Sequence, residues 1–230
     1  MKPKPAKNRV NDCLLLLISC LLPIMLSACF GVSMDISLNK NGSGTLSLEY
    51  QIARSLDSLR KLDGNERWNT IPIGKADFDR TIDRLEGMKM LSYSQKETEN
   101  QILVKVKMSF ETPDALMSFL NADGRRCSFS GNGDSGTLNV KLSDGYKPDG
   151  LESRNSAFYE FLSDISKPYN VNLSMSFPGE GSLIITSASG VILKDAPEIE
   201  IKGQGRNVSC SFPLNTIISS REGINLEFRW

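Results

Sequence analysis

The amino-acid sequence predicts an α+β fold in two layers, with one face of a mainly antiparallel sheet covered by amphipathic helices. Several segments alternate between apolar and polar residues, which is typical of strands with one buried and one wetted face. Other segments place apolar residues three and four positions apart, as amphipathic helices do. The chain has 230 residues, 40% of them apolar, and no long Pro/Gly/Ser linker divides it. We therefore expect a single core.

The clearest strand signal is a hairpin within residues 32–52. Residues 32–38 and 45–52 carry apolar side chains at every second position, and Asn41-Gly42-Ser43-Gly44 lies between them. An Asn-Gly turn between two alternating segments is a strong hairpin signal. The same one-sided alternation predicts further strands at residues 102–110, 171–177 and 224–230.

Four segments have the apolar spacing of helices: 53–62, 75–86, one that starts after Thr112-Pro113, and 152–165. In the second, Phe78 and Ile82 share one face and acidic residues occupy the opposite face. In the third, Thr112 can cap the helix and Pro113 fits its first turn. We expect these helices to cover the apolar face of the sheet.

Residues 1–28 have the features of a secretory signal. Four basic residues precede an apolar stretch, Cys13 to Met25, that is too short to span a membrane. Leu26-Ser27-Ala28-Cys29 follows and resembles the bacterial lipobox. This resemblance implies cleavage between Ala28 and Cys29, a diacylglyceryl thioether on Cys29, and acylation of the new amino group with a fatty acid such as palmitate. An ordinary secretory peptide and an uncleaved anchor are the alternatives.

Such processing would leave residues 29–230 as a single extracytoplasmic domain, lipid-anchored to a membrane of the bacterial cell envelope and facing the periplasm or the surface. The chain has 27 basic and 27 acidic residues, of which residues 1–28 contain four and one. The mature domain would therefore have a net charge near −3. That charge favours neither nucleic acid nor anionic headgroups as partners, so we expect the acyl chains to provide the attachment.

Two further cysteines, Cys127 and Cys210, lie in the mature domain. Both alternate with apolar neighbours, so we expect both to point into the core. An extracytoplasmic compartment permits a disulfide between them, but two buried thiols would have the same sequence pattern. The sequence leaves the pairing open.

The residue combinations that common catalytic and metal sites need are missing. The chain has no histidine, which excludes a Ser-His-Asp site and an imidazole zinc site. Ser135, within a Gly-Asp-Ser-Gly sequence, therefore lacks its base, and the Ser58-x-x-Lys61 pair lacks the companion motifs of penicillin-binding enzymes. We expect no enzyme, no catalytic residue, no metal site and no cofactor.

One family resemblance covers most of residues 29–230. Cys29, the alternating strand after it and the Asn41-Gly42-Ser43-Gly44 turn resemble the start of LppM-type lipoproteins. Residues 171–179 and the strand that reaches Phe212-Pro213 are similar to that family's second block. The chain is also similar to uncharacterised spirochaete lipoproteins. The resemblance implies an extracytoplasmic α+β domain that binds lipid or another hydrophobic molecule, and it supplies no catalytic residue.

We therefore expect a membrane-anchored, non-catalytic module that binds a lipid or other hydrophobic ligand. Methionine and phenylalanine on the inward strand faces suit an adaptable apolar surface, although both are also ordinary core residues. The alternative is a structural lipoprotein that docks an envelope protein. Exposed aromatic surface around Trp68 or Trp230 would favour that alternative.

Overall fold

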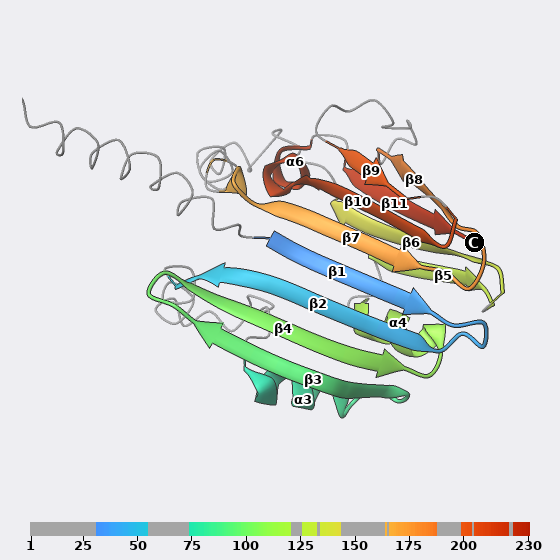
Figure 1. The fold of residues 1–230 in the computed structure, drawn as a ribbon, viewed down its shortest axis with the longest axis horizontal. Coiled ribbons are helices and arrows are strands. Elements are labelled where there is room, and N and C mark those ends of the chain that lie inside the picture. Colours follow the sequence, from blue (N-terminus) through green and yellow to red (C-terminus); the bar gives the residue numbers. More distant parts are fainter. Residues whose placement is uncertain are drawn as a thin grey trace, which may run out of the picture.

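The fold is that of a computed structural model, which describes residues 31–54, 74–120, 126–132, 134–143, 164, 166–187, 199–203, 205–220 and 223–230 (Figure 1). The described strands are β1 (Gly31–Leu38), β2 (Gly44–Ala53), β3 (Met88–Glu97), β4 (Gln101–Phe110), β5 (Cys127–Gly131), β6 (Gly136–Ser143), β7 (Asn170–Ser176), β8 (Ser182–Thr186), β9 (Glu200–Lys202), β10 (Asn207–Pro213) and β11 (Ile224–Arg229). The described helices are α3 (Lys75–Ile82), α4 (Pro113–Leu120) and α6 (Leu214–Ser219).

The strands form two sheets. A seven-stranded sheet has the order β3-β4-β2-β1-β7-β10-β9, and a four-stranded sheet has the order β5-β6-β11-β8. The smaller sheet lies behind one half of the larger one (Figure 1). Neighbouring strands are antiparallel except β1 and β7, which pair in parallel from Gly31↔Asn170 to Ser37↔Ser176.

The predicted α+β architecture is wrong, because the second layer is built largely from strands. The described helices are short, at eight, eight and six residues, and α3 and α4 contact β3, β4 and β5 without covering the face of the large sheet. The error has a physical cause. Alternation shows that a strand has one apolar face, but it does not show whether a helix or another sheet buries that face.

Most local predictions are confirmed. The predicted hairpin forms, with Val32 opposite Tyr50 and Leu38 opposite Gly44. The strands predicted at 102–110, 171–177 and 224–230 are β4, β7 and β11, and the helices predicted from Lys75 and from Pro113 are α3 and α4. The helices predicted at 53–62 and 152–165 lie almost entirely outside the described residues, although Ala53 belongs to β2.

Both sheets share one hydrophobic core. Leu46 and Met108 of the large sheet and Leu226 of the small one are each 0% exposed and belong to one cluster of buried side chains. Aromatic rings also join the sheets: Trp230, after β11, stacks on Phe177, after β7, with ring centroids 5.3 Å apart. Because the apolar faces of the two sheets bury each other, neither sheet forms a complete core alone.

The two ends of the large sheet differ. At one end β1 joins β2 through a tight turn, in which Asn39 N–H donates to Ser43 C=O at 2.8 Å. At the other end lie the first residues of β1 and β7 and Pro213, the last residue of β10, which pairs with Asn170. Because Cys29 precedes β1 by two residues, this second end, called the anchor end below, is where a lipidated cysteine would attach.

Candidate functional site

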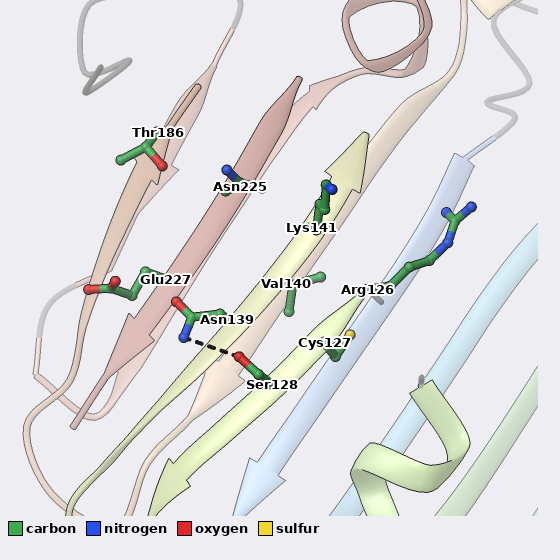
Figure 2. A pocket seen from close by; sticks show the side chains of 9 residues that line it. All are labelled: Arg126, Cys127, Ser128, Asn139, Val140, Lys141, Thr186, Asn225 and Glu227. Atoms are coloured by element: carbon green, nitrogen blue, oxygen red, sulfur yellow. Dashed lines mark hydrogen bonds between the residues drawn. The ribbon is translucent and has the colours of Figure 1, made fainter. Parts of the chain in front are cut away.

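A groove with a volume of about 390 Å³ lies on the small sheet (Figure 2). Its walls come from all four strands, and seven of its nine lining residues have polar or charged side chains. The lining residues are Arg126, Cys127, Ser128, Asn139, Val140, Lys141, Thr186, Asn225 and Glu227.

The strand alternation produces this polar lining. Along β11, Leu226 and Phe228 are buried in the shared core, and the residues next to them point to the opposite side of the sheet. The cross-strand register then aligns polar residues in two rows. One row is Lys141, Asn225 and Thr186, and the other is Ser128, Asn139 and Glu227.

Hydrogen bonds and charges order the groove. Asn139 Nδ2 donates to Ser128 Oγ at 3.5 Å, and Asn225 Nδ2 donates to the Ser187 carbonyl at 3.4 Å. The carboxylate of Glu227 forms an ion pair with Arg229 on the same strand. With amide, hydroxyl and charged groups facing one space, the groove can exchange hydrogen bonds with a polar ligand.

One part of the groove, lined by Arg126 and Lys141, lies toward the anchor end of the domain. Helix α6 follows Pro213 at this end and contacts β6, the strand that carries Lys141. Figure 2 shows Arg126 and Lys141 at the same end of the molecule as the start of β1, with Glu227 farther along the small sheet. A ligand in the groove would therefore lie toward the side on which Cys29 precedes the domain.

The structure places only some of the residues singled out in the sequence. Ala28 and Cys29 lie outside the described residues, as do Ser58, Lys61 and Trp68.

Ser135 and Trp230 have structural roles. Ser135 belongs to the β5–β6 turn, where its backbone N–H donates to Asn132 Oδ1 at 3.1 Å. Trp230 is partly buried between the sheets, with its ring centroid 5.7 Å from that of Phe129. Exposed aromatic surface at Trp230, the feature that would have favoured protein docking, is therefore limited.

The two cysteines lie on different sheets and form no disulfide with each other in the structure. Cys127 is half-buried on β5 at the groove, and Cys210 is buried on β10 at 2% exposure. The expectation that both point into the core is confirmed fully for Cys210 and in part for Cys127. Burial raises the pKa of the Cys210 thiol from the usual 9.0 to about 12.

This raised pKa predicts a loss of stability in alkali. The folded protein keeps the Cys210 proton at pH values where the unfolded chain has lost it, so the contribution to stability is complete below pH 9.0 and is lost as the pH rises toward about 12. Replacing Cys210 with valine should therefore reduce, by about 1–2 kcal/mol, the fall in unfolding free energy between about pH 8 and about pH 10.5. Urea unfolding at both pH values measures the difference, and an unchanged fall would contradict it.

Apart from Cys127, the groove residues were not identified from the sequence. Seven of the nine are ordinary polar or charged residues in or next to the small sheet, and they lie up to about a hundred positions apart, from Arg126 to Glu227. Only the pairing of four strands brings them together. The polar positions in the alternating segment 224–230 predicted that these side chains are exposed to solvent, but they did not predict a binding site.

Comparisons with known proteins give one distant match. No family model matches the chain, and no curated protein matches it. The fold is similar to the NMR structure of the folded domain of LppM from Mycobacterium tuberculosis, with a TM-score of 0.34 and 10% sequence identity over 80% of this chain and 89% of that one. The function proposed below is inferred from this chain's own residues and geometry.

No described helix is both long enough and apolar enough to cross a bilayer. Within the same part of the chain, no three His, Cys, Asp or Glu side chains gather closely enough to hold a metal ion.

Proposed function

We propose that this chain is a non-catalytic binding module of the bacterial envelope, anchored in a membrane through lipidated Cys29, whose groove on the small sheet takes the polar part of an amphiphile. The observation that carries the proposal is the position of the groove. Two of its lining residues, Arg126 and Lys141, lie toward the anchor end, and its polar lining can hydrogen-bond a headgroup.

The short tether supports a close approach to the bilayer. One residue, Phe30, lies between Cys29 and the start of β1 at Gly31, so the Cα atoms of Cys29 and Gly31 are at most about 7 Å apart. Two or three acyl chains on Cys29 would make the attachment stable, because each buried CH₂ contributes about 0.8 kcal/mol. The anchor end, with Arg126 and Lys141, would then lie near the headgroups of the same membrane.

The groove also limits how an amphiphile would bind. The described core is filled by side chains such as Phe110 and Phe212, both 1% exposed, and the groove itself is polar. We therefore assign recognition to the headgroup, while the acyl chains of the ligand stay in the bilayer. This differs from the sequence-based expectation of a hydrophobic ligand held on apolar strand faces.

Native mass spectrometry of the full chain, produced in bacteria and purified from membranes in mild detergent, tests both halves of this proposal. The expected protein mass is that of a chain that starts at Cys29 and carries a diacylglyceryl group, and a Cys29→Ser variant should lack it. Discrete lipid adducts are expected on the wild type. Asn139→Trp, which fills the groove, should lower their fraction about tenfold.

The matched control is Lys107→Trp, at an exposed position on β4 of the other sheet, and it should leave the adducts unchanged. An unmodified protein mass would contradict the anchor, and equal adducts on Asn139→Trp would contradict the groove as the site. A bare lipidated protein would overturn the ligand proposal. It would favour the docking of an envelope protein instead, for which Leu91, 54% exposed at the bulge of edge strand β3, is the specific observation.

A further inference from the structure

The outward face of β1, β7 and β10 on the large sheet carries short polar side chains at nearly every position. We call this surface the hydroxyl–amide face. Its members are Ser33, Asp35, Ser37, Asn170, Asn172, Ser174, Ser176, Asn207, Ser209 and Ser211. No described helix or strand lies over it (Figure 1).

The neighbouring half of the same outward face is chemically different. On β2 and β4 the outward positions include Glu49, Lys105 and Lys107, and Lys105 Nζ lies 2.7 Å from Glu49 Oε2. Long charged side chains of this kind are what a merely solvated strand face carries. Thr45 and Ser47 on β2 are also short and uncharged, so the change from long charged groups occurs across β2.

Cross-strand hydrogen bonds order the hydroxyl–amide face. Ser211 Oγ donates to Asn172 Oδ1 at 2.7 Å, and Ser176 Oγ donates to Asn207 Oδ1, also at 2.7 Å. Ser174 Oγ donates in the same way to the carboxylate of Asp35. These bonds lie along the register rows of the parallel β1–β7 pair and the antiparallel β7–β10 pair.

The same bonds leave donors for a partner. Two of the three use the amide oxygen of an asparagine, and within the described part of the chain no hydrogen bond involves Nδ2 of Asn172 or of Asn207. Both residues are exposed. Because the side chains are short and already held by neighbours, binding would cost little side-chain entropy.

The composition of this face narrows the class of partner. The core of a protein interface is enriched in aromatic residues, methionine and arginine and depleted in serine, which is the reverse of what is found here. Nucleic acid and anionic lipid require lysine or arginine, and none occupies the ten positions. The groups present match a neutral partner that both donates and accepts hydrogen bonds over an extended surface.

We propose that the hydroxyl–amide face binds a neutral polysaccharide, whose hydroxyl and acetamido groups exchange hydrogen bonds with the serine and asparagine rows. The face runs along β1 for about 26 Å from Gly31, at roughly 3.3 Å per residue. With the proposed anchor at Cys29, two positions before Gly31, this face would therefore reach a glycan beside the membrane. This inference is independent of the ligand in the groove, which lies on the other sheet.

Co-sedimentation of the full lipidated chain in detergent micelles with insoluble chitin, a neutral polymer of N-acetylglucosamine, tests the proposal. The protein should sediment with chitin equally at about 0.1 M and about 0.5 M salt, because a neutral partner adds no screened charge pair. Asn172→Lys with Ser174→Lys, which places two long charged side chains on the face, should weaken binding at least about tenfold.

Two further variants keep the test decisive. Asn172→Ala removes one amide and should weaken binding by a smaller factor even if the double lysine variant fails to fold. Lys105→Ser with Lys107→Ser, on the charged half of the same sheet, should leave sedimentation unchanged. Absence of sedimentation with chitin, its loss at high salt, or equal weakening by the Lys105 and Lys107 changes would each overturn the proposal.

Discussion

Replacing Leu226 with alanine is expected to lower the free energy of unfolding by about 2–5 kcal/mol. Leu226 is 0% exposed at the centre of β11, which pairs with both β6 and β8, so truncation would leave a cavity beneath the small sheet. Because the two sheets share one core, the loss should affect the whole domain. Urea unfolding followed by circular dichroism and by tryptophan fluorescence should give one shifted transition with both probes.

The control for this change is Ile201→Ala on edge strand β9. Ile201 is 40% exposed, so its truncation should change the unfolding free energy by about 0.5 kcal/mol or less. Two separate transitions in the Leu226→Ala variant, with only one of them shifted, would mean that the sheets unfold independently. That result would contradict the shared core.

Replacing Gly44 with alanine is expected to cost about 3 kcal/mol, which is large for the addition of one methyl group. A Cβ atom at this position would lie 2.1 Å from the Ser37 carbonyl oxygen and 2.4 Å from Phe110 Cζ. The methyl group would therefore push apart the start of β2 and its neighbours on both sides, β1 and β4. The midpoint of urea unfolding measures the effect.

Gly179 provides the matched control. A Cβ atom there would meet no heavy atom within 4 Å, so Gly179→Ala should change the stability by about 0.5 kcal/mol or less. If Gly44→Ala were as mild as this control, the close packing of β2 against Phe110 and the β1 backbone would be wrong.

Short-range patterns predicted the individual elements well. The β1–β2 hairpin follows from two alternating segments around Asn41-Gly42, and α4 begins at Pro113, where Thr112 Oγ accepts a hydrogen bond from the Ala115 N–H at 3.2 Å. Both signals lie within a few residues of the structure that they specify. Local physical chemistry is sufficient for such features because the interacting groups are neighbours in the chain.

The architecture and both proposed binding surfaces could not be obtained in this way. The groove needs Lys141 beside Asn225, and the hydroxyl–amide face needs Asp35 beside Ser174. The sequence of one strand does not specify which distant strand it will pair with, because many pairings would bury the same apolar residues. For this reason the prediction of a helical layer was wrong, and the sequence did not distinguish the polar residues of the groove from ordinary solvent-exposed residues.

The sequence by itself determined which side of the five predicted strands is buried, where the hairpin turns, where α3 and α4 begin, and where a lipidated cysteine would precede the domain. These features depend on side-chain period, turn sterics and a contiguous motif, all of which are local. Only the tertiary structure decided that a second sheet covers the first, that β1 and β7 run parallel, and that one sheet face is lined with serine and asparagine. Those outcomes depend on contacts between residues that lie from about 30 to about 140 positions apart, because burial is satisfied by the whole chain and not by any single segment.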